Sequence, residues 1–269
     1  MELPQEKLPL VNEMYEAACR ERGEQRNYLG MSSIGDPCKR KLWLSFMGYD
    51  PLPIEGRAAM IFDLGSRVED AVIHWLEAAG YTIEGQQQDF TAHNGFFRGH
   101  CDGIIHGVTQ KPHILEIKSA NAKKFKAFKE QGIASVSPVY YAQVQCYMGY
   151  SGLERAVWVV MCKDNCELYT ERVHFNQAHF DALHQRALEI LTAREMPEKT
   201  EGMCQWCEQR AWCGGRSVQT RQTCGTCIYC WAGLEPRCSH LDHQVPIKRW
   251  GTGCPDWQLC DPHCPDLPF

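Results

Sequence analysis

The sequence has little that would place the protein in a membrane or on an export route. Among its 269 residues, no apolar run approaches the roughly 18 residues that a membrane-spanning helix needs. The first stretch, MELPQEKLPLVNE, is acidic and lacks the apolar segment of a secretory signal peptide. We therefore expect a cytoplasmic protein.

The sequence also lacks an excess of positive charge. Its formal net charge is −5, so the molecule as a whole does not attract nucleic acid as a strongly basic protein does. A local basic strip can still bind phosphates at this net charge. Hydrophobic residues make up 44% and charged residues 23%, and the length suffices for a domain of about 200 residues with an appendage.

Cysteine, by contrast, is abundant: there are 16, and ten of them lie from Cys204 onward. In a reducing cytosol, closely spaced cysteines are typical of metal sites rather than of disulfides. Cys204, Cys207 and Cys213 form a tight group of three thiolates that needs a fourth ligand from elsewhere. Tetrahedral sulfur sites hold zinc or an iron–sulfur cluster, and spacing alone does not separate the two.

The tail from residue 214 onward carries a second set of possible ligands. Its first residues, GGRSVQT, indicate a linker, and few apolar residues follow, so we expect a metal to hold the segment together. The favoured zinc ligands are Cys224, Cys227, Cys238 and Cys254. Other donors stay open as alternatives: Cys230, Cys260, Cys264, His240, His243 and His263.

The stretch Phe96–Ser119 predicts a β-hairpin that carries charge in its interior. Its arms, FFRGHCDGII and HILEIKS, have the apolar character of strands. Glu116 and Lys118 share one face of the second arm because side chains repeat every two residues, and Asp102 is expected in mid-strand in the first arm. Burying three charges is unfavourable unless they serve each other or a metal.

The trio Asp102, Glu116 and Lys118 suits phosphodiester hydrolysis. Two carboxylates are hard oxygen ligands for Mg²⁺ or Mn²⁺, which would hold a phosphate oxygen and lower the pKa of a bound water. The ammonium of Lys118 would orient that water and balance charge in the transition state. A salt-bridged structural hairpin accounts for the same three residues equally well.

Helices and a second hairpin are predicted around this unit. A long helix over Arg57–Ala79 has an apolar stripe, with Glu69 at its edge and His74 on the opposite, solvent side. Further helices are predicted over Pro4–Arg26, from Pro37 to about Phe46, over ANAKKFKAFKEQG, from Ser137 onward and over Phe175–Arg194. Strands over RAVWVVMCK and CELYTERVH form the second hairpin. The stripe of the long helix comprises Ile61, Leu64, Val68, Val72, Trp75 and Ala79. This order of elements fits an α/β fold.

Asp102, the run Glu116-Ile117-Lys118 and the later pair Gln143 and Tyr147 together resemble the PD-(D/E)xK nuclease superfamily. The likeness is to its RecB and phage lambda exonuclease-like branch and to the CRISPR-associated iron–sulfur nucleases, and it covers about residues 32–213. Cys101 departs from the motif, which has proline there. The resemblance implies a restriction-endonuclease-like core, with a central mixed sheet flanked by helices, ahead of a small cysteine-rich metal-binding tail.

The resemblance also implies roles for individual residues. Asp102 and Glu116 would bind Mg²⁺ or Mn²⁺, and the backbone carbonyl of Ile117 would contribute. Glu69 would complete the site, because it follows Gly65 by four residues as in the lambda-type branch; a plain edge carboxylate is the alternative, and His74 is the less favoured ligand.

A glutamine and a tyrosine one helical turn apart are implied to lie beside the active site. Gln143 and Tyr147 would contact the substrate or support the metal ligands. Tyr141 and Gln145 have the same spacing, so periodicity alone does not choose between the two pairs.

In the resembling iron–sulfur nucleases, a cysteine at the place of Cys38 supplies the first cluster ligand. The resemblance therefore predicts a [4Fe–4S] cluster on Cys38, Cys204, Cys207 and Cys213, with zinc as the alternative. The chain would then consist of an iron–sulfur nuclease domain over residues 1–213 and a zinc-binding tail over 214–269.

The predicted function is a metal-dependent DNA exonuclease that acts on DNA ends or single strands in recombination or repair, as in a phage or mobile element. Lys123, Lys124 and Lys126 follow the catalytic strand and are expected to contact the DNA backbone, unless they only form a solvated helix. The alternatives are an endonuclease, a CRISPR-type end-trimming enzyme, and a non-catalytic module that binds DNA ends or a partner protein.

Overall fold

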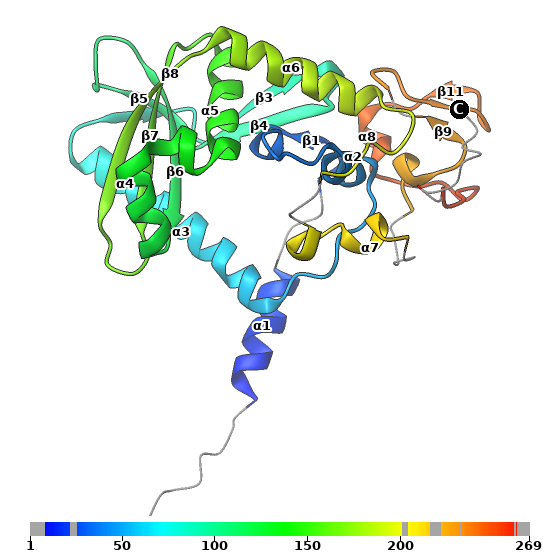
Figure 1. Ribbon diagram of the computed structural model, residues 1–269, viewed down its shortest axis with the longest axis horizontal. Coiled ribbons are helices and arrows are strands. Elements are labelled where there is room, and N and C mark those ends of the chain that lie inside the picture. The colour runs from blue at the N-terminus through cyan, green and yellow to red at the C-terminus, as the bar shows by residue number, and fades with distance from the viewer. Residues whose placement is uncertain are drawn as a thin grey trace, which may run out of the picture.

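The computed structural model describes residues 9–21, 26–200, 204–215, 222–231, 233–260 and 262. At its centre is a five-stranded sheet in the order β2-β5-β6-β7-β8 (Figure 1). β6 and β7 run parallel and the other neighbouring pairs run antiparallel, so the sheet is mixed. Its strands are β2 (Thr82–Glu84), β5 (Gly103–His106), β6 (His113–Ala120), β7 (Arg155–Cys162) and β8 (Leu168–His174).

Helices cover both faces of this sheet, which confirms the predicted mixed α/β fold. On one face, α3 (Gly56–Ala78) packs Val68 and Val72 against Leu115 and Ile117 of β6. On the other face lie α4 (Ala122–Val136) and α5 (Pro138–Ser151). Because β6 is covered on both sides, six of its eight residues are buried, as is typical of a central strand.

The first arm of the predicted hairpin is divided between the large sheet and a second, three-stranded sheet. β1 (Leu29–Gly30), β4 (Phe97–Cys101) and β3 (Gln88–Ala92) pair in the order β1-β4-β3, whereas β5 pairs with β6 in the large sheet. Asp102 lies between β4 and β5 and belongs to neither strand. The prediction of a mid-strand aspartate was therefore wrong: the chain bends at Asp102 as it passes from one sheet to the other.

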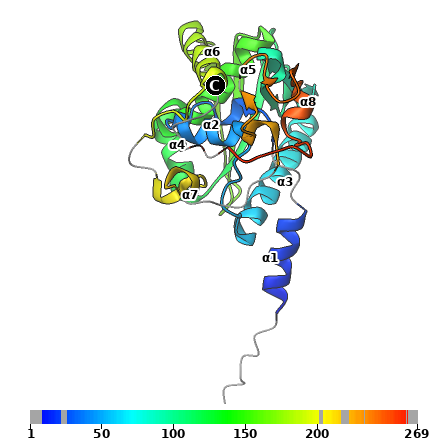
Figure 2. The same ribbon diagram turned by 90° about the vertical axis from the view of Figure 1, so that its right-hand side faces the viewer.

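Long helices extend beyond the sheets. α3 runs from the large sheet towards α1 (Leu10–Arg20), which projects from the body (Figures 1 and 2). The predicted stripe of α3 is wrong at Ile61, Leu64 and Trp75, which are exposed, because this helix is longer than the surface it covers. Residues 4–8 and 22–25 of the predicted first helix lie outside the described part. Among the described helices, none is long and apolar enough to cross a membrane.

The C-terminal tail packs against α2 (Lys39–Met47), below α6 (Gln177–Thr192) (Figure 1). The ring of Trp250 stacks on that of Phe46 at 5.3 Å, and its Nε1 donates a hydrogen bond of 3.1 Å to Phe46 O. Tyr49 OH donates to Cys260 O at 2.8 Å. The tail thus has apolar contacts of its own with the segment that follows Cys38. Two short helices precede the tail, η3 (Cys204–Trp206) and α7 (Arg210–Cys213). The described elements of the tail are η4 (Cys224–Thr226), β9 (Cys230–Trp231), β10 (Arg237–Cys238), β11 (His243–Gln244) and α8 (Ile247–Trp250).

Candidate active site

The register of β5 against β6 brings Asp102 and Glu116 together. Gly103 pairs with Leu115 in antiparallel register, so Asp102, which precedes Gly103, lies beside Glu116, which follows Leu115. Asp102 Oδ2 accepts a hydrogen bond of 2.6 Å from the amide nitrogen of Ile117. Asp102 and Glu116 are both buried, so two carboxylates lie under the surface, one at the bend before β5 and one within β6.

Lys118 connects this pair to the surface. Its Nζ donates a short hydrogen bond to Glu116 Oε1 and another of 3.2 Å to the carbonyl oxygen of Ile117. The Lys118 side chain is 23% exposed, whereas that of Glu116 is fully covered. A substrate would therefore reach the ammonium before it reached the glutamate.

Helix α5 supports Glu116 from the other side. Gln143 Nε2 donates hydrogen bonds to Glu116 Oε1 at 2.7 Å and to Tyr147 OH at 3.0 Å. The ring of Tyr147 fits because Gly99 has no side chain: a Cβ there would lie 2.7 Å from Tyr147 Cε1. Gln143 and Tyr147 are both buried, so they are placed to hold Glu116 rather than to meet DNA directly.

The other pair with the same spacing faces elsewhere. Gln145 donates to His174 O and accepts from the amide of Asn176, both at 2.8 Å. Both of these bonds hold the junction of β8 and α6. The structure thus distinguishes the two pairs that periodicity left equal.

Glu69 of α3 faces the carboxylates, whereas His74 is exposed. Burial raises the pKa of Glu69 to about 7, and the charge of Asp102 adds to the shift. Glu69 Oε1 also accepts a hydrogen bond of 2.6 Å from Gln87 Nε2. Sequence reasoning missed Gln87, because it lies in a loop that offers no periodic signal.

The charges of the site are unbalanced. Burial raises the pKa of Glu116 to about 8, and the charges of Asp102 and Glu69 add to this despite Lys118. Burial alone would lower the pKa of Lys118, but the charges of Glu116 and Asp102 outweigh it and raise that pKa. Burial also raises the pKa of Asp102. One ammonium thus faces three carboxylates, which favours binding of a further cation.

The donor set fits a hard divalent cation. Glu116 Oε2 is buried without a hydrogen-bond partner in the described part of the chain, so one carboxylate oxygen remains for another ligand. Asp102, Glu69 and the carbonyl of Ile117 supply further oxygens of the kind that Mg²⁺ and Mn²⁺ prefer. Across the described ranges, no group of three or more His, Cys, Asp or Glu side chains is already arranged to hold a metal ion. The predicted metal sites therefore stay predictions.

The four cysteines of the predicted cluster surround one small cavity. It has a volume of about 170 Å³, and Cys38, Cys204, Cys207 and Cys213 all line it as free thiols. Arg40 Nη1 lies 3.6 Å from Cys213 Sγ, and Lys41, Lys199 and Arg210 also line the cavity. The neighbouring cations would offset the negative charge of four thiolates, whether these hold an iron–sulfur cluster or a zinc ion.

A second cysteine-lined cavity of about 100 Å³ lies in the tail. All four predicted zinc ligands line it, together with Cys230 and His243. Cys230 faces Cys238 across the pairing of β9 and β10, so it competes with the predicted set. Cys264 and His263 lie outside the described residues.

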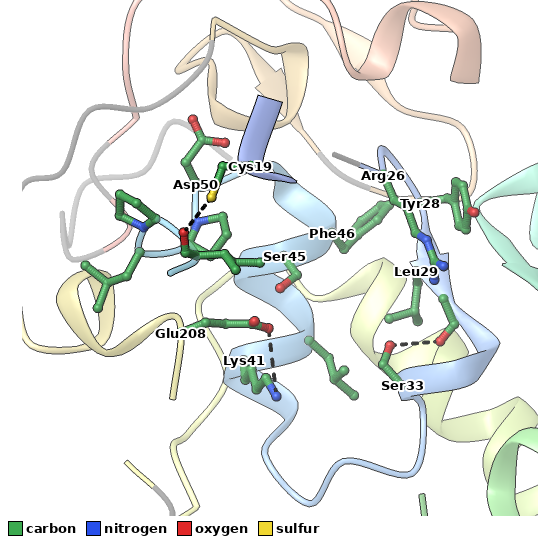
Figure 3. A pocket seen from close by; sticks show the side chains of 16 residues that line it. Cys19, Arg26, Tyr28, Leu29, Ser33, Lys41, Ser45, Phe46, Asp50 and Glu208 are labelled. Carbon is green, nitrogen blue, oxygen red and sulfur yellow. Dashed lines mark hydrogen bonds and ion pairs between the residues drawn. The ribbon is translucent and has the colours of Figure 1, made fainter. Parts of the chain in front are cut away.

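A larger cavity of about 630 Å³ lies beside α2 (Figure 3). Arg26, Ser33 and Lys41 point into it, and Lys41 pairs with Glu208 at 3.9 Å. None of the carboxylates of the candidate site lines it. The volume of this cavity therefore does not indicate the candidate site that the sequence motifs predict.

A family model matches part of the chain. Residues 64–154 match the model of the YqaJ-like viral recombinase domain. The matched segment contains every residue of the carboxylate site and ends before the cysteine-rich segments; its site residues are Glu69, Asp102, Glu116, Ile117, Lys118, Gln143 and Tyr147. No curated protein matched the chain.

Solved structures of exonucleases are similar at low identity. An alkaline exonuclease from Laribacter hongkongensis is 15% identical, with a TM-score of 0.46, over 67% of this chain and 90% of that one. A structure of that enzyme in complex with dAMP is 16% identical, with a TM-score of 0.47 and the same coverage. A phage-related exonuclease from Haemophilus somnus is 16% identical, with a TM-score of 0.35, over 45% and 64%. The expected closeness to CRISPR-associated iron–sulfur nucleases stays a prediction.

Proposed function

We propose that this protein is a metal-dependent DNA exonuclease that acts in recombination, and the match of residues 64–154 to the model of the YqaJ-like viral recombinase domain supports this. One observation carries the proposal: two buried carboxylates and an ammonium converge where β5 and β6 adjoin. A purely structural ion pair does not require Gln143 to hold the same glutamate, nor Glu69 to face the same spot.

The residues of the chain divide the work as follows. Asp102, Glu116, Glu69 and the carbonyl of Ile117 would hold Mg²⁺ or Mn²⁺, which when bound polarises the phosphate and acidifies a water. Lys118 would orient the attacking water and offset negative charge on the phosphate.

Gln143 and Tyr147 act on the orientation of Glu116. Gln143 holds Oε1 of Glu116, which leaves Oε2 directed to a ligand, and Tyr147 fixes the amide of Gln143. A carboxylate held in this way needs little rearrangement when the substrate arrives, which is the general advantage of a preorganised site.

The cysteine-lined cavities have structural roles in this proposal. A [4Fe–4S] cluster on Cys38, Cys204, Cys207 and Cys213 would join the start of α2 to the end of the nuclease segment. A zinc ion on four of the tail cysteines would hold the tail in shape, and the tail would offer a surface to DNA or to a recombination partner.

The test compares wild type with Asp102→Ala and Lys118→Ala on end-labelled single and double strands and on closed plasmid circles. Each substrate is incubated with Mg²⁺, with Mn²⁺ and with EDTA. We expect the wild type to shorten linear DNA with either metal and to leave circles intact, and both variants to be inactive. Cut circles would replace the proposal with an endonuclease. DNA binding that survives EDTA, without cleavage in any metal, would replace it with a non-catalytic binding module.

A further inference from the structure

Two lysine ammoniums lie over one aromatic ring beside the carboxylates. Lys118 Nζ is 5.7 Å from the centre of the Tyr140 ring, and Lys124 Nζ is 4.8 Å from the same centre. The face of a tyrosine ring carries partial negative charge and attracts cations. Tyr140 therefore gives both ammoniums a common contact.

The three side chains come from three elements whose ends meet. Lys118 lies near the end of β6, Lys124 in the first turn of α4 and Tyr140 in the first turn of α5. The side chain of Asn121 caps α4 by accepting a hydrogen bond of 2.9 Å from the amide of Lys124, which fixes where that turn begins. Tyr140 is half-buried and packs against the core, so its ring is the fixed member of the group.

Two other lysines of α4 form ion pairs with neighbouring acids, whereas Lys124 Nζ lies over the rings of Tyr140 and Phe128. Lys126 pairs with Glu130 at 3.7 Å, and Lys129 forms a short ion pair with Glu167. Within the described residues, no carboxylate lies within 4.0 Å of Lys124 Nζ. Two ammoniums close to one ring repel each other, and an anion placed between them removes that repulsion.

We propose that Tyr140 is a positioning residue that holds Lys118 and Lys124 so that they contact neighbouring phosphates of one DNA strand. Lys118 contacts the phosphate to be cleaved and Lys124 contacts the next one. Such contacts fix the strand in register and read no base, which suits an enzyme that advances along DNA. The inference rests on the proposed function, because it names the part of that substrate which these residues hold.

The first test measures binding without cleavage. A fluorescent single-stranded oligonucleotide is titrated in EDTA over a series of salt concentrations with wild type, Lys124→Gln, Tyr140→Leu, Tyr140→Phe and the double variant Lys124→Gln/Tyr140→Leu. Lys124→Gln should flatten the slope of log affinity against log salt by about 0.7, the value for one phosphate of a single strand. Tyr140→Leu should flatten it in the same direction and add nothing to Lys124→Gln, whereas Tyr140→Phe should keep the wild-type slope.

Lys129→Gln is the matched control, since Lys129 lies in the same helix with its Nζ 5.6 Å from the centre of the Phe125 ring. It should leave the slope unchanged. If Lys129→Gln flattens the slope as much as Lys124→Gln, or if the effects of Tyr140→Leu and Lys124→Gln simply add, the role of the ring is overturned. Circular dichroism checks that each variant is folded. Should Tyr140→Leu unfold, Lys124→Gln still decides, because an unchanged salt slope in that variant overturns the proposed phosphate contact.

The second test separates this inference from the proposed function. In turnover with Mn²⁺, Lys124→Gln should raise KM with little change in kcat, whereas Tyr140→Leu should raise KM and lower kcat because it releases Lys118 as well. Cleavage that depends on Asp102 but shows no coupling between Tyr140 and Lys124 would keep the exonuclease and overturn the inference. If Tyr140 and Lys124 are coupled in DNA binding but the protein never cleaves DNA, the inference stands and the exonuclease is overturned.

Discussion

The amide of Ile117 donates a hydrogen bond of 2.6 Å to Oδ2 of Asp102, across the junction between two β-sheets. Because this donor belongs to the backbone, it holds the carboxyl group of Asp102 whatever the side chains of β6 do. The neighbouring side chain, Glu116, lacks such a backbone donor at Oε2. The site thus combines one carboxylate fixed by the main chain with one left partly unpaired.

Asp102→Asn removes the charge and keeps an oxygen that can accept from Ile117. We expect cleavage of labelled DNA in Mn²⁺ to fall by more than about 100-fold, since even residues behind the metal ligands cost 10–100-fold when changed. The melting temperature should stay near that of wild type. Asp89→Asn is the control, because Asp89 pairs with Arg98 at 3.0 Å. Equal activity of wild type and Asp102→Asn would contradict the assignment.

Gln143 and Gln145 offer a matched pair of substitutions on one helix. Gln143→Met removes the hydrogen bond to Glu116 and should lower kcat about 10–100-fold. Gln145→Met leaves His174 O and the amide of Asn176 without their partner, which should cost about 1–3 kcal/mol of stability. Its kcat per folded molecule should stay near wild type. Urea unfolding measures the stability of both variants, and steady-state kinetics measures their kcat. If Gln145→Met lowers kcat and Gln143→Met does not, the assignment of Gln143 to the site is wrong.

Metal affinity should rise with pH. In the metal-free protein, burial and neighbouring charge raise the pKa of Glu116 to about 8 and that of Glu69 to about 7. Both groups therefore hold protons near pH 6 that an incoming Mn²⁺ must displace. Calorimetry in two buffers of different ionisation enthalpy should detect proton release, and affinity should increase up to about pH 8. An affinity that is flat from pH 6 to 9 would contradict this.

The raised pKa of Glu116 also determines whether the free energy of unfolding rises or falls with pH. Between the ordinary glutamate pKa of 4.5 and the folded value of about 8, the folded state holds a proton on Glu116 that the unfolded chain has lost. The free energy of unfolding of the metal-free protein should therefore fall as pH rises through this window. Lys118 is charged in both states there and does not alter the sign. Urea melts in EDTA at pH 6 and 8.5 measure the fall, which Glu116→Gln should make smaller, with the remainder due to the raised pKa of Glu69.

The sequence predicted the site better than the path of the chain around it. Period-two alternation placed Glu116 and Lys118 on one face, and the strands of the large sheet follow their apolar runs. A strand pattern does not say which sheet a strand joins, so the bend at Asp102 could not be found. Hydrophobic periodicity likewise cannot tell how far a helix extends past its sheet, which is why Trp75 of α3 was wrongly expected to be buried.

Long-range contacts account for the rest of what the sequence did not reveal. Periodicity left Gln143 and Gln145 equal, and only the packing of α5 against β6 and β8 separates them. Gln87 and Tyr140 meet the site from a loop and from a helix start, where no repeat marks them. Composition suggested that the tail has no core, yet Trp250 completes the core of α2.

Cys38→Ser tests the predicted cluster with little change to the local helix. Cys38 is the N-cap of α2, a position that serine fills well, so a loss of stability reports on the thiol. We expect loss of bound iron and of absorbance near 400 nm in anaerobically purified protein. The free energy of unfolding should drop by roughly 4–5 kcal/mol, the value for a cross-link that closes a loop of this length. Cys19→Ser, at an exposed cysteine, should change neither, and a wild type that binds zinc instead would exclude the cluster.

Trp250→Ala tests whether the tail and the preceding α/β segment fold as one unit. The substitution removes the stacking on Phe46, the edge contact with Phe96 at 5.7 Å and the hydrogen bond to Phe46 O. Loss of so large a buried side chain should cost about 3–5 kcal/mol. Trp75→Ala is the control, because Trp75 is 47% exposed and surface changes usually stay within about 0.5 kcal/mol. If the tail is part of the core, calorimetry should show the single transition of Trp250→Ala shifted to lower temperature. Two transitions, with the α/β segment melting where it does in wild type, would show instead that the tail is an independent domain.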